Sequence, residues 1–127
     1  MPIIYHEKSK TFHLYNDEVS YIFTILKNNQ LGQLYYGQKI KDREDFTHLF
    51  ELRPRAMSVC TFEGDLAFSL EHIKQEYPAY GTGDMRHPAF DLLQTNGSHI
   101  TDFKYKEHSI IPVSYTHLRA HETAANL

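Results

Sequence analysis

A chain of 127 residues with a formal net charge of −3 is long enough for one domain with one hydrophobic core. It is too short to include a (β/α)₈ barrel, which takes about 250 residues, and it has no basic stripe of the kind that phosphate-driven nucleic-acid binding requires. No apolar run approaches the roughly 20 residues that cross a bilayer. A single cysteine and the absence of a basic and apolar leader after Met1 predict a cytoplasmic protein without disulfides.

The first third of the chain predicts antiparallel strands. Residues 12–15 mark a short strand, and the turn-forming residues 16–18 follow it. Residues 19–26, VSYIFTIL, are β-branched and aromatic with apolar side chains on both faces, which is typical of an interior strand packed on two sides. Residues 31–36 return as the hairpin partner of that strand, and Gly37 ends them.

The middle of the chain is less regular. Residues 38–69 have no clean period and predict a long loop with fragments of strand, and long loops inside compact domains are often functional. Residues 70–76, LEHIKQE, predict one or two helical turns, which Ser69 caps and Pro78 stops.

A hairpin is the clearest local signal in the last third. Asn96-Gly97 lies between AFDLLQT and SHITDFKY, and this dipeptide favours a type I′ turn because both residues tolerate positive φ. Many short strands joined by polar turns predict an all-β fold. We therefore expect an antiparallel β-sandwich (supersandwich) fragment with one short helix.

The last 15 residues depart from this pattern. VSYTHLRAHETAANL, residues 113–127, begins with a segment that is similar to the translation of a transposon-derived sequencing adapter in one reading frame. We expect residues 113–127 to be a foreign tail and residues 1–112 to be a partial N-terminal domain. The alternative is a genuine C-terminal helix, since LRAHETAANL has good helix formers. The spacing of His117 and His121 would then imitate a helical metal pair.

Four segments of residues 1–112 occur in the same order as in a known family. They are IIYHEKSKTFHL (3–14), QLGQLYYGQKI (30–40), AFSLEHIKQEYPAYGTGDMRHPAF (67–90) and NGSHITDFKYKEHSI (96–110). The strongest block is EYPAYG followed by Asp84 and Arg86. Together these segments resemble the N-terminal domain of glycoside hydrolase family 36 α-galactosidases.

The resemblance implies a larger parent enzyme with an N-terminal β-sandwich, a central (β/α)₈ barrel and a small C-terminal sheet domain. Such an enzyme hydrolyses terminal α-galactose from melibiose, raffinose and stachyose with retention, using two carboxyl groups on the barrel. We therefore expect no catalytic residue and no cofactor in this chain. The resemblance also implies a full-length homo-oligomer, often a tetramer, in which the N-terminal domain of one subunit reaches toward a neighbour's active site.

The candidates for contact with substrate or with a neighbouring subunit are Arg53, Arg55, Asp65, Tyr80, Asp84 and Arg86. The first two lie in the loop that the resemblance places near a neighbour's active site, where a guanidinium group donates hydrogen bonds to hydroxyls or carboxylates. Asp84 and Arg86 favour an ion pair that braces their own loop over a contact with a partner.

An aromatic platform for a sugar is one interpretation of Tyr80 together with Tyr35, Tyr36 and Tyr77. Core or interface residues are the commoner role of tyrosines on strands and loops. Cys60 beside an apolar neighbour is expected to be a small hydrophobic residue and not a nucleophile.

No metal ion is expected, because the histidines are scattered without ligand spacing. The acidic residues of the middle loop favour a solvated surface. From the sequence, function stays open between a supporting domain of a larger hydrolase, a stand-alone carbohydrate-binding module and an inert interaction module.

Overall fold

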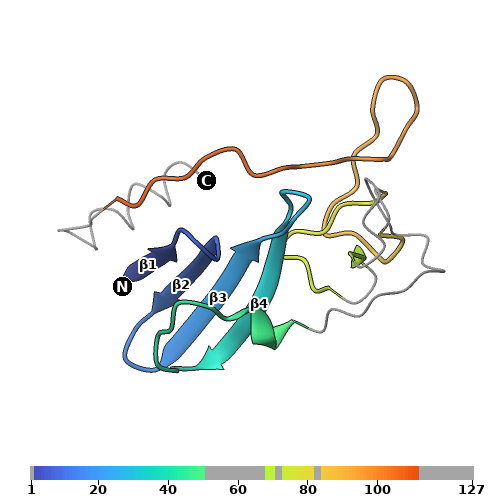
Figure 1. Ribbon diagram of the computed structural model, residues 1–127. Helices are drawn as coiled ribbons and strands as arrows, with labels where there is room; N and C mark the ends of the chain where they lie inside the picture. Colours follow the sequence, from blue (N-terminus) through green and yellow to red (C-terminus); the bar gives the residue numbers. More distant parts are fainter. Residues whose placement is uncertain (1, 51–67, 71–72, 82–83, 112–127) are drawn as a thin grey trace, which may run out of the picture.

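The computed structural model describes residues 2–50, 68–70, 73–81 and 84–111, and its N-terminal part is a single antiparallel sheet (Figure 1). The strands are hydrogen-bonded in chain order: β1 (Ile3–His6), β2 (Thr11–Tyr15), β3 (Val19–Ile25) and β4 (Leu31–Gln38). A short 3₁₀ helix, η1 (Thr47–Leu49), follows β4. The predicted all-β antiparallel class is therefore confirmed.

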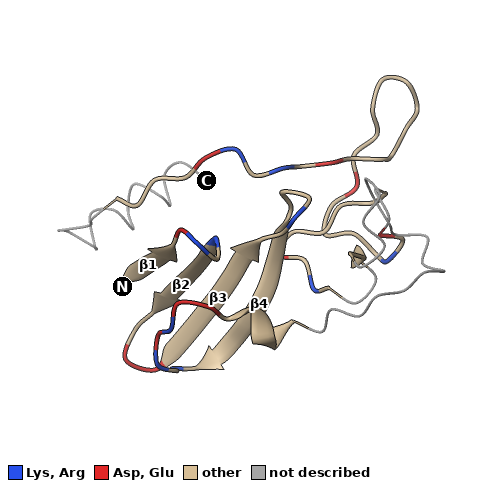
Figure 2. Cartoon of the chain, in the orientation of Figure 1, with Lys and Arg blue, Asp and Glu red and all other residues tan. Residues whose placement is uncertain are grey.

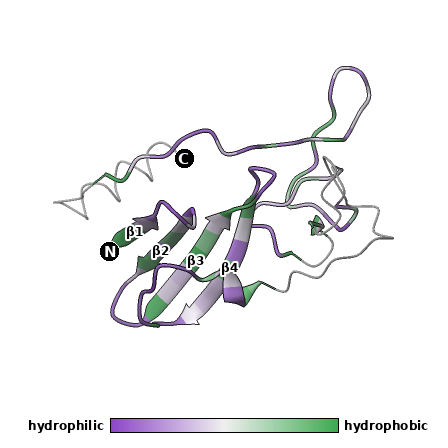
Figure 3. Ribbon diagram, in the orientation of Figure 1, coloured by the Kyte–Doolittle hydropathy of each residue, from purple (hydrophilic) through white to green (hydrophobic). Residues whose placement is uncertain are grey.

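The four strands contain no Lys, Arg, Asp or Glu, so every charge of this part of the chain lies in a turn or loop (Figure 2). Their β-branched and aromatic side chains suit a pleated surface that is covered by other parts of the chain. Figure 3 shows hydrophobic residues mainly on β1, β2 and β3 and hydrophilic ones along the turns, while β4 is mostly pale or hydrophilic. The predicted strands match the observed ones to within two residues at each end.

Asparagine side chains and left-handed residues set the turns. The Asn16 side-chain oxygen accepts hydrogen bonds from the backbone N–H groups of Glu18 and Val19, at 2.8 Å each, which confirms the predicted turn between β2 and β3. Asn29, at φ 67°, lies in the left-handed region between β3 and β4, and Lys10, at φ 52°, does so between β1 and β2. Asn tolerates this region better than most residues do.

The two faces of β3 have different environments. Ser20, Ile22 and Thr24 point to one face and are at most 3% exposed, together with Thr11 and His13 opposite them on β2. The other face is aromatic and less completely buried: Phe12 is 6% exposed, Tyr21 and Phe23 are half-buried, and Phe23 stacks on Phe12 at 4.8 Å between ring centroids. The prediction that β3 packs on two sides is thus met fully on one face, and that face is largely polar.

The predicted helix at residues 70–76 is wrong for residues 74–76. Gln75 forms an antiparallel bridge with Gly32. Around that bridge, the Gln33 N–H donates to Lys74 O at 2.7 Å and the Glu76 N–H donates to Leu31 O at 2.9 Å. Residues 74–76 therefore run as an extended segment along the free edge of β4. Satisfying that edge outweighs a weak helical propensity, because unpaired backbone groups are costly where they are buried.

The predicted type I′ turn at Asn96-Gly97 is also wrong in type. The Gly97 N–H donates to Gln94 O, and the Gln94 N–H donates to Ser98 O, each at 2.9 Å. Gly97 has φ +84°, whereas Asn96 is not among the residues with positive φ. The hairpin is therefore a three-residue loop with Gly97 in the left-handed position. The two arms of the hairpin are not β-strands.

After the hairpin the chain runs back over the sheet toward β1, as the orange to red segment of Figure 1 shows. The Tyr105 N–H donates to Asn29 O at 2.6 Å. Further along, the His108 ring lies against Tyr5 and Phe12 at 4.5 and 4.6 Å between centroids. This return segment covers part of the aromatic face and leaves Phe103 and Ile111 more than half exposed.

Candidate functional site

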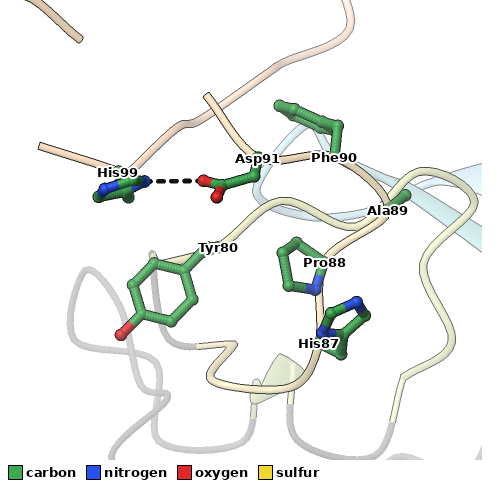
Figure 4. Close-up of a pocket in the computed structure, with 7 residues that line it drawn as sticks. All are labelled: Tyr80, His87, Pro88, Ala89, Phe90, Asp91 and His99. Atoms are coloured by element: carbon green, nitrogen blue, oxygen red, sulfur yellow. Dashed lines mark hydrogen bonds and ion pairs between the residues drawn. The ribbon is translucent and has the colours of Figure 1, made fainter. Parts of the chain in front are cut away.

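A pocket of about 530 Å³ lies between the loop that precedes the hairpin and the hairpin itself (Figure 4). Among the described residues it is lined by Tyr80, His87, Pro88, Ala89, Phe90, Asp91 and His99. The lining combines aromatic rings, a proline ring, two imidazoles and one carboxylate. Such a mixture of apolar surface and a few polar groups is typical of small-molecule sites.

Backbone pairing holds the walls of the pocket. Gly81 and Asp84 exchange both N–H···O hydrogen bonds, at 3.2 and 3.1 Å. The Ala89 N–H donates to Pro78 O at 2.9 Å, and the Thr101 N–H donates to Tyr80 O at 3.1 Å. The loop is therefore tied both to itself and to the hairpin.

A stack of three parallel rings joins the same segments. Phe90 lies between Tyr77 and Phe103, with centroid distances of 5.1 and 5.2 Å and interplanar angles of 13° and 19°. The stack thus attaches the hairpin to Tyr77, the residue that directly follows the edge-pairing segment 74–76. The geometry of the pocket depends on this stack.

Two polar side chains on opposite arms of the hairpin meet at the pocket. His99 Nδ1 lies 2.7 Å from Asp91 Oδ1, and both side chains are at least half exposed. No other hydrogen bond of the Asp91 carboxylate occurs within the part of the chain that the structure describes, so Oδ2 is available. The Tyr80 hydroxyl likewise has no hydrogen-bond partner among those residues, and Tyr80 is 36% exposed.

Asp84 and Arg86 form a brace that does not line the pocket. Arg86 Nε lies 2.9 Å from Asp84 Oδ1, and Nη2 lies 3.0 Å from Oδ2, a two-pronged contact. Nη2 also donates to the carbonyls of Leu70 and Ile73, and Gln75 donates to Asp84 Oδ2 at 2.9 Å. Burial acts to raise the pKa of Asp84, but the hydrogen bonds and charge of Arg86 hold that pKa below its ordinary value.

A second buried polar cluster lies on the covered face of the sheet. His13 Nε2 is 2.9 Å from Ser20 Oγ, and His13 Nδ1 is 2.8 Å from Asp42 Oδ1. His6 Nε2 reaches the same Asp42 oxygen at 3.0 Å. Burial acts to raise the pKa of Asp42, but hydrogen bonds from His6 and His13 hold that pKa below its ordinary value.

The order Ser20–His13–Asp42 imitates a nucleophilic triad. Ser20 is 0% exposed, however, and its oxygen accepts the Ile40 N–H at 3.0 Å. No substrate reaches an oxygen placed in this way. The cluster instead fixes residues 40–46 over the sheet, where the buried Phe46 ring meets the edge of the His13 ring at 5.5 Å.

One buried carboxylate oxygen in the described residues has no hydrogen-bond partner there, Glu76 Oε2. Burial raises the pKa of Glu76.

No cluster of metal-ligating side chains that could hold an ion is found in residues 2–50, 68–70, 73–81 and 84–111. In that same portion, no helix has the length and apolar character needed to span a membrane.

The structure separates the candidate residues that the sequence indicated. Tyr80 lines the pocket, whereas Asp84 and Arg86 pair with each other away from it. Arg53, Arg55 and Asp65 lie outside the described residues, and so does Cys60. The four tyrosines do not form one platform, since Tyr35 and Tyr36 point to opposite faces of β4.

The sequence did not indicate the other residues that line the pocket, His87, Phe90, Asp91 and His99 among them. A signal for two of them existed in the Asn96-Gly97 turn. A hairpin centred there brings residues 91 and 99 toward each other across its arms, and an Asp–His pair at those positions invites a hydrogen bond. The contribution of the preceding loop had no such local signal.

Comparisons with known proteins agree on one family. The model of the glycosyl hydrolase family 36 N-terminal domain matches residues 29–127. The chain is 36% identical over 110 residues to alpha-galactosidase AgaA of Geobacillus stearothermophilus, a match covering 87% of this chain and 15% of that protein. It is 30% identical to the bifunctional alpha-galactosidase/sucrose kinase AgaSK of Mediterraneibacter gnavus, covering 87% of this chain and 12% of that protein.

Solved structures give the same result. The alpha-galactosidase from Lactobacillus brevis has a TM-score of 0.75 and 40% identity, over 83% of this chain and 14% of that one. The alpha-galactosidase AgaB from Geobacillus stearothermophilus has a TM-score of 0.72 and 35% identity, over 86% and 14% of the two chains. The chain therefore spans about a seventh of the length of these relatives.

Proposed function

This chain belongs to the glycosyl hydrolase family 36 N-terminal domain family, and on that basis we propose that it is the non-catalytic N-terminal part of an α-galactosidase. The observation that carries the proposal is the extent of the match. Most of this chain aligns with α-galactosidases, yet it corresponds to at most 15% of their length. The remaining length of the relatives is where a catalytic domain has room.

The chemistry of the pocket supports a non-catalytic role. Retaining hydrolysis of a glycoside needs two carboxyl groups about 5 Å apart on either side of the bond. The described lining of the pocket contains one carboxylate, that of Asp91, and an imidazole is bound to it. In the proposed parent enzyme both catalytic carboxyls belong to the barrel, and the substrates are α-galactosides such as melibiose, raffinose and stachyose.

The role of this part is then to support the barrel and the assembly of subunits, and we propose a homo-oligomer, a tetramer, for the parent enzyme. Exposed large apolar side chains support an interface. Several lie along the hairpin and the segment after it: Leu92, Leu93, Ile100, Phe103, Ile110 and Ile111. Exposed apolar patches of this kind mark surfaces that a partner or further chain covers.

We still propose that Arg53, Arg55 and Asp65 contact substrate or a neighbouring subunit.

A cytoplasmic location is also a proposal, supported by the single cysteine. We further propose that residues 113–127 are foreign. The support is the similarity of VSYTHLRAHET to a translated sequencing adapter; the family match, which extends over residues 29–127, counts against it.

A hydrolysis assay tests the non-catalytic role. We expect purified residues 1–127 to release no p-nitrophenol from p-nitrophenyl α-galactopyranoside above the buffer rate, because a barrel is absent. A full-length α-galactosidase serves as the positive control. Saturable turnover that copurifies with the chain and disappears in an Asp91→Asn variant would show that this part carries catalysis of its own, against the proposal.

A further inference from the structure

We propose that the pocket beside the hairpin is a binding site for one terminal galactose ring, an accessory sugar site on a domain that does not catalyse. The inference rests on the proposed function for the choice of galactose. Its geometric basis is independent of that choice. A volume of about 530 Å³ falls within the range of about 300–1,000 Å³ that small-molecule sites occupy, and it is large enough for a monosaccharide ring with its neighbouring linkage.

The apolar part of the lining suits the C–H face of a pyranose. The Tyr80 and Pro88 rings come from the loop before the hairpin (Figure 4). Phe90 also lines the pocket, but both of its faces are covered by Tyr77 and Phe103. The axial hydroxyl of galactose leaves contiguous C–H groups on one face of its ring. Such a face packs on aromatic and proline rings, which present apolar surface without conformational freedom of their own.

The polar part of the lining offers groups for the hydroxyls. Asp91 Oδ1 is held by His99 at 2.7 Å, and the second carboxylate oxygen has no partner among the described residues. A carboxylate accepts hydrogen bonds only, so it selects the O–H donors of a sugar. The Tyr80 hydroxyl, also unpartnered there, both donates and accepts. His87 adds an imidazole at the opposite wall.

The walls are positioned before any ligand arrives. The bonds from Ala89 to Pro78 and from Thr101 to Tyr80 fix the two sides of the pocket. Phe90 is held between two rings, and His99 orients the Asp91 carboxylate. A site built in this way loses little conformational entropy when it binds, which is what a weak sugar contact requires.

The test is a titration of residues 1–127 with methyl α-galactopyranoside, followed by ¹⁵N-resolved backbone chemical shifts. We expect saturable shifts confined to residues 80–99 with a Kd on the order of 1 mM. Methyl α-glucopyranoside, which lacks the axial hydroxyl, is expected to bind at least fivefold more weakly. The spectrum of the free chain shows at the same time whether each variant is folded.

Two variants and two matched controls locate the site. Asp91→Asn and Tyr80→Phe are expected to weaken galactoside binding at least fivefold. Asp17→Asn, in the turn before β3, and Tyr36→Phe, on β4, are expected to leave it unchanged. Absence of saturable shifts up to 100 mM sugar, or equal loss in the controls, would overturn the site.

The same titration separates the site from the proposed function. Equal binding of both glycosides would overturn the assignment of galactose. Failure of all binding would remove the site without bearing on the α-galactosidase assignment, which the hydrolysis assay and the source gene test separately.

Discussion

Replacing Arg86 with methionine is expected to destabilise the chain by about 3 kcal/mol, because the change leaves a buried carboxylate without its cation. Asp84 is 2% exposed, and Arg86 contacts both of its oxygens. The guanidinium side chain is 48% exposed, so we place the effect at the lower end for buried ion pairs. The same change releases two backbone carbonyls, those of Leu70 and Ile73.

Urea unfolding followed by circular dichroism measures this effect. Arg43→Met serves as the matched control, since Arg43 is exposed in the loop after β4, and it is expected to change the free energy of unfolding by less than about 0.5 kcal/mol. Asp84→Asn combined with Arg86→Met is expected to recover part of the loss, because the buried charge is removed. Equal stability of Arg86→Met and the unaltered chain would contradict the bracing role.

The pH dependence of the brace has a definite sign. The pKa of Asp84 in the folded chain lies below the ordinary value of 3.8, so its contribution is fully present above that value. It is lost as the pH falls through the lowered pKa. The difference in stability between the unaltered chain and Arg86→Met should therefore shrink in acid, since Asp84 of the variant takes up a proton more readily.

Replacing His13 with phenylalanine is expected to cost about 2–3 kcal/mol, although the ring is kept. His13 is 1% exposed and bridges Ser20 and Asp42. The carboxylate only accepts hydrogen bonds, so Nδ1 carries a proton toward Asp42, while Nε2 is hydrogen-bonded to the Ser20 hydroxyl. Phenylalanine satisfies neither partner, and the Ser20 hydroxyl is left buried without its imidazole partner.

Hydrogen exchange of the Ile40 amide reports this change locally, because that amide donates to Ser20 Oγ. We expect it to exchange at least tenfold faster in His13→Phe, as residues 40–46 loosen from the sheet. His48→Phe is the control, since His48 is exposed on η1. Unchanged exchange at Ile40 would mean that the cluster does not hold the segment.

The pKa of Asp42 is below its ordinary value. The contribution of Asp42 to stability is therefore present above that ordinary value and is lost as the pH falls through the lowered pKa.

The strands were predictable because their signal is local. Residues 19–26 alternate along a run that carries no charge, and β3 occupies almost the same range. The polar character of the covered face was not predictable from that run. It depends on the register that places His13 opposite Ile22, and on Asp42 arriving from 29 residues away in sequence.

Two local predictions were wrong, the helix at residues 70–76 and the turn type at Asn96-Gly97, and most of the pocket lining was missed. Residues 70–76 have the composition of a helical turn, yet Gln75 pairs with Gly32 because the edge of β4 offers unpaired backbone groups. The Asn96-Gly97 loop was placed correctly, and only its turn type was wrong. The pocket was indicated through Tyr80 alone, because its lining is assembled from segments whose meeting depends on tertiary contacts.

A sequence read of the source DNA through the codon of Ile111 tests directly whether this chain is part of a larger α-galactosidase. We expect the reading frame to continue past residue 112 without VSYTHLRAHETAANL, through further strands and into a (β/α)₈ barrel. An encoded VSYTHLRAHETAANL followed by a stop codon would contradict this expectation, and the chain would then be a free-standing domain in which the sugar pocket is the leading candidate for function.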